Sequence, residues 1–485
     1  MSSSSISSHK DKEMSDPEKA QEGVERRSSN GLNKPPSYDS TGAAHVEDAV
    51  FGEVSGDGPN YRNVGWVATI ALMAKTQVGL GVLSIPKTFD ALGLIPGVIC
   101  LCTVGVITTW SDYMVGVFKR NHPDVYAIDD AGHKMFGKIG REIFATIFML
   151  YWIFVSGSAM LGISIGFNSL SSHAVCTAVF VAVAGILTFL FSSIRTLSKI
   201  SWLAWVGLVC IMTAIFSVTV AVGVQDRPAA APKQGPWESD FKLFNNPTFA
   251  EAITAISSQI FAYSGTPAFF SIAAEMREPK HYTRSLLWAQ GLVSVTYIAI
   301  GVVVYYYCGS YVASPALGSA GVIMKKVCYG FALPGLIVTA MIVTHSQKVP
   351  AKYLFLRILR GSHHLNSNSF THWATWLGCT GGVTVIAYII ACAIPVFGAL
   401  VSLIGALLGT FMCFQPFGCM WLFDNWGRKD RDIKWTLMVC WSVFVIVIGT
   451  FCMVAGTYGS VVGIIDSAKS DGGAAPWSCA DNSNS

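Results

Sequence analysis

The chain has 485 residues, of which 52% are hydrophobic and only 13% are charged. Soluble proteins carry about 25% charged residues, so the composition excludes an ordinary soluble enzyme or binding domain. The formal net charge of +4 indicates little about partners, because the charges gather in short segments between long apolar runs. This pattern is typical of a protein that crosses a membrane many times.

Residues 1–62 differ in composition from everything that follows. They are rich in Ser, Asp, Glu, Lys, Gly and Pro and cannot bury a core, so we predict a disordered cytosolic tail. Within this tail, Pro35, Pro36 and Tyr38 form a Pro-Pro-x-Tyr sequence that resembles a WW-domain ligand. Such a segment is preformed as polyproline II and binds an aromatic groove at low entropic cost. The expected partner is a WW-domain ubiquitin ligase, and the alternative is a chance match in an idle tail.

Apolar runs of spanning length follow the tail and predict an all-α membrane domain over 63–465. We expect eleven helices, at 66–89, 93–118, 142–167, 174–194, 200–224, 249–275, 284–308, 328–347, 372–393, 395–423 and 434–464. The last two runs are long for a single span, and tilt or kinks would absorb the excess.

A hydrophilic connector at 225–248 divides the spans into two sets of five. We therefore predict one repeat at 63–224 and a second at 249–423. The helix at 434–464 is additional, and 466–485 form a short tail.

Positive charge predicts which face of the membrane each connector occupies. The connectors 119–141, 195–199, 277–284, 348–371 and 424–434 hold 18 Lys and Arg, whereas the connectors of the other face and the C-terminal tail hold seven. Cytosolic loops are enriched in Lys and Arg, so the first set and the N-terminus are predicted to be cytosolic. An odd number of spans then places the C-terminal tail outside the cell or in a lumen.

Two of the predicted spans contain helix-breaking residues. The first has Gly79 and Gly81 followed by Pro86, and the sixth has Gly265 and Pro267 among small hydroxylated residues. Glycine weakens a helix and proline removes a backbone donor, so both helices should open there. Interrupted spans at corresponding positions of two repeats are how secondary transporters form a substrate site at mid-membrane.

These breaks lie in motifs that resemble the amino acid/auxin permease family, within the amino acid–polyamine–organocation superfamily. The first-helix motif is GLGVLSIP at 79–86, and the sixth-helix motifs are FAYSG at 261–265 and EMREP at 275–279. The segment YAIDDAG at 126–132 is similar to the family's connector between the second and third helices. More narrowly, the chain resembles neutral amino-acid permeases of filamentous fungi. The resemblance implies a LeuT-like 5+5 inverted repeat that moves neutral amino acids by alternating access.

The resemblance also implies which residues contact the substrate. Backbone amides after the first break would bind the substrate carboxylate, and carbonyls of the sixth helix would accept hydrogen bonds from its ammonium. The predicted substrate-binding residues are Thr76, Gln77, Gly79, Leu80, Gly81, Phe261, Ala262, Tyr263, Ser264, Gly265 and Thr266. For each polar side chain among them, packing between helices is the alternative.

Two intramembrane ionisable residues, Lys75 and His345, are candidates for ion coupling. Proton-coupled members of the family more often carry Lys four residues before the first glycine, where sodium-coupled members tend to carry Asn. The resemblance therefore implies a proton gradient as driving force and no cofactor or metal. The alternative for Lys75 is a permanently charged brace against the eighth span, and for His345 a packing histidine.

The cysteines and the remaining motifs add little to the prediction of function. Cys308 and Cys328 should border the same extracytosolic connector, where a disulfide could form if that side is oxidising.

The expected protein is a proton-driven importer of neutral amino acids in the plasma membrane, or in the vacuolar membrane. An amino-acid sensor without net flux, a vacuolar exporter and, last, a membrane-bound enzyme are the alternatives.

Overall fold

The computed structural model describes residues 64–483 except 194–196, 229, 233, 346–353, 356–357, 359–368 and 470–474, together with three short strands nearer the N-terminus. The chain divides into two units, Met1–Tyr61 and Arg62–Ser485. In the first unit, strands β1 (Ser37–Tyr38), β2 (Ala44–Asp48) and β3 (Gly52–Val54) pair antiparallel in that order. Pro35 and Pro36 lie outside the described residues, so the disordered tail and its WW ligand stay predictions.

All eleven predicted apolar runs form helices. Their bounds are α2 (Trp66–Gln77) with α3 (Ile85–Leu92), α4 (Leu94–Asn121), α5 (Ile128–Ser171), α6 (Thr177–Ser192), α7 (Leu197–Val224), α8 (Phe249–Tyr263) with α9 (Phe269–Glu275), α10 (Tyr282–Cys308), α11 (Val322–His345), α13 (Phe370–Ala393), α14 (Phe397–Leu403) with α15 (Thr410–Cys413) and α16 (Gln415–Asn425), and α17 (Ile433–Lys469). Among the described residues, eight helices are long and apolar enough to cross a membrane, or nine if the bent pair α2–α3 counts as one span. The remaining two predicted runs are α6, which is shorter than a usual span, and α8 with α9, which is interrupted.

Two runs are more irregular than their hydropathy predicts. The helix α5 begins 14 residues before the predicted third span, capped by the Asp130 carboxylate, which accepts hydrogen bonds from the amides of Tyr126 and Ala127 at 3.1 Å. It bends at Gly137, whose φ of 69° suits glycine. The long run at 395–423 is interrupted by a π-helical turn at Ile404–Gly409 and again before Pro416, which explains its length.

The first and sixth spans are broken where the sequence predicts. After α2 the chain forms a short 3₁₀ turn, Gly81–Ser84, and turns by 43° into Gly81–Leu92. After α8 a second 3₁₀ turn, Thr266–Ala268, leads into α9. The two broken spans are also joined at one end, because Val64 donates to the Glu275 carbonyl at 3.3 Å and accepts from the Arg277 amide at 3.0 Å.

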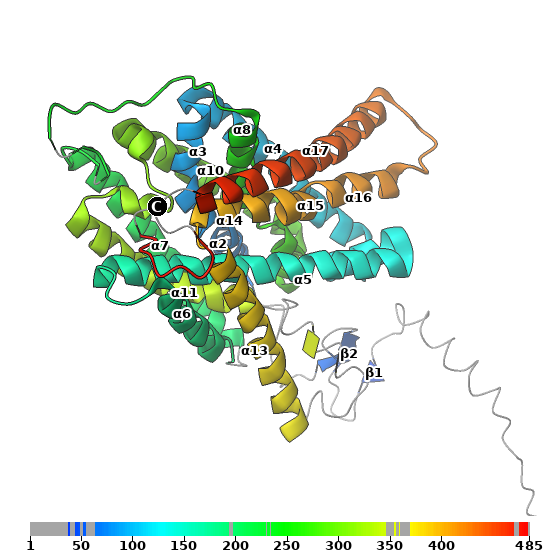
Figure 1. The fold of residues 1–485 in the computed structure, drawn as a ribbon. Coiled ribbons are helices and arrows are strands. Elements are labelled where there is room, and N and C mark those ends of the chain that lie inside the picture. The colour runs from blue at the N-terminus through cyan, green and yellow to red at the C-terminus, as the bar shows by residue number, and fades with distance from the viewer. Residues whose placement is uncertain are drawn as a thin grey trace, which may run out of the picture. The chain divides into compact units, whose positions relative to one another are not determined.

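The helices pack in two groups. The broken spans α2–α3 and α8–α9 pack with α4 and α10, and we call this set the bundle group. The long helix α5 packs with α6, α11 and α13, and we call this set the scaffold group (Figure 1). Helix α7 contacts both groups, through α11 on one side and α10 and α2 on the other.

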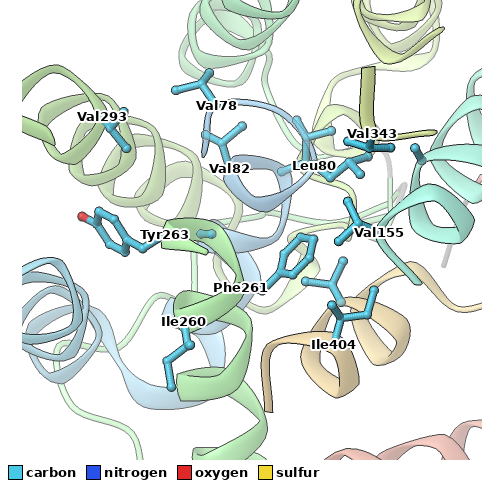
Figure 2. Packing of buried hydrophobic residues seen from close by; sticks show 14 of the residues in the cluster. Val78, Leu80, Val82, Val155, Ile260, Phe261, Tyr263, Val293, Val343 and Ile404 are labelled. Carbon is cyan, nitrogen blue, oxygen red and sulfur yellow. The ribbon is translucent and has the colours of Figure 1, made fainter. Parts of the chain in front are cut away.

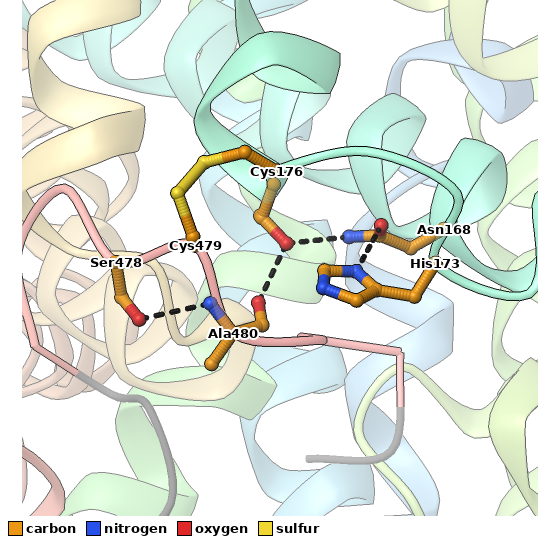
Figure 3. The surroundings of a disulfide bond; sticks show 7 residues. Asn168, His173, Cys176, Ser478, Cys479 and Ala480 are labelled. Atoms are coloured by element: carbon orange, nitrogen blue, oxygen red, sulfur yellow. Dashed lines mark hydrogen bonds between the residues drawn. A yellow bond between two sulfur atoms is a disulfide. The ribbon is translucent and has the colours of Figure 1, made fainter.

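A disulfide between Cys176 and Cys479 ties the C-terminal segment to the loop between α5 and α6 (Figure 3). Around it, Asn168 donates to Asn482 Oδ1 at 2.7 Å and the Thr177 hydroxyl donates to the Ala480 carbonyl at 2.6 Å. The candidate pair of the sequence is wrong, because Cys308 and Cys328 are both buried and free. Helix α17 extends to Lys469, so the C-terminal tail begins later than predicted.

Candidate substrate cavity

A cavity of about 100 Å³ lies beside the two breaks, between the bundle and scaffold groups. Its lining is mainly apolar and aromatic. The lining residues are Leu72, Lys75, Thr76, Gln77, Gly79, Leu80, Gly81, Phe148, Tyr151, Trp152, Val155, Phe261, Ser264, Ala268, Ser271, Thr339, Ile342 and Val343.

One tyrosine of α10 holds both broken helices at their carbonyl ends. The hydroxyl oxygen of Tyr297 lies 2.8 Å from the carbonyl oxygen of Gln77, at the end of α2, and 2.8 Å from that of Ala262, near the end of α8. The last carbonyls of a helix lack intrahelical partners and carry its negative dipole end. Because its hydroxyl has one hydrogen, Tyr297 donates to one or the other of two carbonyls that would otherwise be unpaired in the membrane interior, and its side chain is fully buried.

The carbonyls proposed for the substrate ammonium already have partners. Ser264 O accepts a hydrogen bond from the Tyr151 hydroxyl, Phe261 O accepts one from the Ser264 amide at 3.0 Å, and Ala262 O faces Tyr297. A carbonyl oxygen has two lone pairs, so each can accept one further bond. Of the three residues, Ser264 and Phe261 line the cavity and Ala262 does not.

The glycines of the breaks serve different purposes. A methyl group at Gly81 would collide with the backbone of Ala262, and one at Gly265 would lie 2.7 Å from Gln77 Cγ and 2.8 Å from Thr76 Oγ1. These two glycines let the broken spans approach each other. At Gly79 the nearest atom would be Thr339 Cγ2 at 3.9 Å, so this glycine leaves open space beside the backbone.

Lys75 lies at the cavity and its ammonium donates to Thr339 Oγ1 of α11 at 2.7 Å. This contact joins the first span to the eighth, as the bracing alternative requires, although the acceptor is a hydroxyl rather than a carbonyl. In the part of the chain that the structure describes, no carboxylate forms an ion pair with Lys75. His345 is the last residue of α11, and its side chain lies outside the described residues.

The cavity contains most of the predicted residues, but four lie elsewhere. Ala262 packs against Gly81, and Gly265 packs against Gln77. Tyr263 donates its hydroxyl to Ser294 of α10 at 3.0 Å, on the opposite side of α8 from Phe261 (Figure 2). The Thr266 hydroxyl faces Asp112 of α4 rather than the cavity.

Most of the lining that the sequence did not name comes from α5 and α11, and the rest, Leu72, Ala268 and Ser271, comes from the broken spans. On α5, Phe148, Tyr151, Trp152 and Val155 follow the i, i+3, i+4, i+7 spacing of one helix face. That spacing was visible in the sequence, but a lipid-facing stripe in a membrane span is equally apolar. No residue of the tenth span lines the cavity among those described, although Ile404 lies near Phe261 and Val155 (Figure 2).

Broken spans that enclose a small cavity between two helix groups define a secondary membrane transporter. The chain belongs to the transmembrane amino acid transporter protein family, whose model matches residues 62–462. It is 34% identical over 432 residues to a transmembrane transporter of Gibberella moniliformis, covering 88% of this chain and 90% of that protein. It is 32% identical over 433 residues to the N amino acid transport system protein of Neurospora crassa, covering 87% and 89% of the two chains.

Solved structures show the fold. The protein is similar to MhsT in complex with L-phenylalanine, with a TM-score of 0.51 and 13% identity over 81% of this chain and 98% of that one. A Na⁺-coupled sialic acid symporter in a substrate-bound outward-open state also gives a TM-score of 0.51, at 13% identity over 83% and 90%. The fold is therefore LeuT-like, as predicted. Membership of the transporter family makes the protein an amino acid transporter rather than an enzyme.

Proposed function

We propose that the protein imports neutral amino acids by proton symport, with alternating access at the cavity between the two breaks. The observation that carries the proposal is the cavity lining, whose described residues include seven large apolar or aromatic side chains of α5, α8 and α11 and no carboxylate. A cationic substrate side chain would have no counter-charge there. Lys75 is the one cation among the described lining residues, and we assign it to proton coupling rather than to binding a substrate side chain.

The two charged ends of the substrate would bind mainly to the backbone. The carboxylate fits beside Gly79, where the open space and the positive end of the restarting helix coincide. The ammonium fits beside the Ser264 carbonyl, with Thr76 and Gln77 as further polar neighbours. Backbone groups bind a zwitterion without placing additional charges at mid-membrane, where they are costly.

Lys75 supports proton rather than sodium coupling. Its ammonium occupies the surroundings of the first break and would repel a sodium ion there. His345 remains a second candidate for coupling by its place at the end of α11.

The import direction rests on the topology. The distribution of Lys and Arg supports a cytosolic N-terminus, and the Cys176–Cys479 bond supports an oxidising compartment around the C-terminal segment. Both fit a plasma-membrane protein whose C-terminal segment lies outside the cell, and in that membrane inward proton symport is import.

Uptake by the purified protein in liposomes tests the proposal. Radiolabelled phenylalanine should accumulate under an inward proton gradient without sodium, and a competition screen with all twenty amino acids should rank neutral ones first. Binding without flux would indicate a sensor. Proton-coupled release of amino acids from the acidic lumen of isolated vacuoles would indicate a vacuolar exporter. Equal competition by lysine or glutamate would contradict the neutral specificity.

A further inference from the structure

A carboxyl group lies buried inside the bundle group, away from the substrate cavity. Asp112 is on α4, in the half that ends at Asn121, and its side chain is fully buried. One carboxyl oxygen, Oδ2, accepts a hydrogen bond from Gln290 Nε2 of α10. The other, Oδ1, has no hydrogen-bond partner among the described residues, and neither has Gln290 Oε1.

Among the described residues, no cation pairs with Asp112. The titratable groups that face it are the Tyr282 phenol from α10 and the Cys413 thiol from α15, and the Thr266 hydroxyl approaches from the sixth-span break. Helices α3, α8, α9 and α16 also pack against α4, but no charged side chain of theirs pairs with Asp112 in the described parts of the chain. A buried carboxylate without a cation is costly, whereas a carboxylic acid is neutral and adds a hydrogen-bond donor beside the unpartnered oxygens of Asp112, Gln290 and Thr266.

A route to water begins one helical turn away. A pocket of about 270 Å³ at the Asn121 end of α4 is lined by Gly116, Tyr282, Lys119, Arg120 and Arg277 among others. Gly116 follows Asp112 by four residues on the same face of α4, and Tyr282 donates its hydroxyl to the Asp112 backbone carbonyl at 2.8 Å. The pocket therefore lies between Asp112 and the membrane face that the charge distribution predicts to be cytosolic.

Helix α4, which carries Asp112, packs against the 3₁₀ turn of the sixth-span break. Thr266 opens the 3₁₀ turn of the sixth-span break, two residues after Ser264 of the cavity. A change at the break would thus alter the environment of the carboxyl. Once the pocket and Asp112 are connected, the three cations that line the pocket would favour the ionised form of the carboxyl group.

Building on the proposed proton symport, we propose that Asp112 is a proton-binding site of the transport cycle and releases its proton to the cytosolic pocket. The proton enters from the extracytosolic side, binds a carboxyl oxygen of Asp112 while the break is closed around substrate, and leaves to water in the pocket as substrate is released. Asp112 is a positioning and proton-carrying group of this cycle and does not touch the amino acid.

Proteoliposomes containing a pH-sensitive dye test the assignment, with three variants beside the wild type. Asp112→Asn keeps the size and the acceptor for Gln290 but cannot exchange a proton, and Asp112→Glu keeps the titratable group. Asp124→Asn removes an exposed carboxylate just beyond α4, which is paired with Lys134 at 3.1 Å, and serves as the matched control.

We expect Asp112→Asn to lose substrate-driven proton influx and accumulation while keeping exchange of labelled for unlabelled amino acid. Asp124→Asn should behave as wild type. Asp112→Glu should restore proton influx, and the pH profile of this influx should be displaced from that of the wild type. This displacement also tests the assignment if Asp112→Asn is too unstable for exchange to be measured. Wild-type proton influx that persists in Asp112→Asn, or an Asp112→Glu profile identical to wild type, would overturn the assignment. Absence of proton influx in the wild type would instead refute the proposed symport.

Discussion

The hydroxyl group of Tyr297 is expected to stabilise the break in both discontinuous spans, and Tyr297→Phe removes it without changing the size of the ring. The hydroxyl has one hydrogen and lies 2.8 Å from two carbonyl oxygens, those of Gln77 and Ala262, so it donates to one at a time. The variant therefore loses one hydrogen bond and leaves one more buried carbonyl unpaired. An unpaired buried group costs about 1–3 kcal/mol.

A loss of this size is measurable as stability and as transport. If the broken conformation alone is affected, about 1–3 kcal/mol corresponds to a roughly 5- to 150-fold change in its population. We expect the variant to melt at a lower temperature in detergent, as followed by the monodisperse peak in size-exclusion chromatography. We also expect a lower initial rate of uptake at saturating substrate.

Tyr329→Phe is the matched control. Tyr329 of α11 is as deeply buried as Tyr297, but its hydroxyl has no hydrogen-bond partner among the described residues. Removing an unpaired buried hydroxyl is expected to be neutral or stabilising. Equal loss of melting temperature in the two variants would refute the claim that the carbonyl contacts of Tyr297 hold the breaks.

Three further outcomes are expected. Gly79→Leu and Gly265→Leu should each abolish uptake of labelled phenylalanine with surface expression retained. The first fills the open space beside the backbone, and the second collides with Gln77 Cγ. Normal uptake by Gly265→Leu would contradict the mid-membrane site. Lys75→Ala should lose pH-driven accumulation in liposomes yet keep amino acid exchange, whereas continued accumulation against the gradient would remove Lys75 from coupling. Tyr38→Ala should raise the amount of protein at the cell surface without changing uptake per molecule, and an unchanged lifetime in pulse-chase would leave the Pro-Pro-x-Tyr sequence without a role.

The fold was predictable because its main features are local in sequence. Gly79, Gly81 and Pro86 disrupt one helix and Gly265 and Pro267 another, and each break appears where these residues stand. The apolar runs predicted all eleven helical segments. The bend at Gly137 and the π-helical turn in the tenth span were missed, because hydropathy measures where a chain is apolar and not how its backbone bends.

The candidate site was only partly predictable because its other half is distant in sequence. The contacts of Tyr151 with Ser264 and of Tyr297 with Gln77 join residues 113 and 220 positions apart. Nothing in a single span distinguishes such a tyrosine from one at the lipid interface. Likewise, the bonded cysteines are separated by 303 residues, whereas the pair chosen from the sequence was close along the chain.

Asp112 illustrates a different limit. The sidedness of the loops was judged from Lys and Arg, so an acidic residue near the end of a span contributed nothing to that judgement. Its environment depends on Gln290 and Thr266, which come from other helices. Only the packed structure distinguishes a buried carboxyl from one at the membrane surface.

The polar contacts of the cavity divide according to the two helix groups, and this division indicates which of them must change during transport. The contacts of Tyr297 with Gln77 and Ala262 lie within the bundle group, so they can persist while that group moves as a body. The contacts of Lys75 with Thr339 and of Tyr151 with Ser264 join the bundle group to the scaffold group. A rocking motion of the bundle group against the scaffold group must strain or break the contacts that join the two groups. Variants of Tyr297 should therefore act on the stability of the transporter, whereas variants of Lys75, Thr339 and Tyr151 should act on the balance between its outward- and inward-facing states.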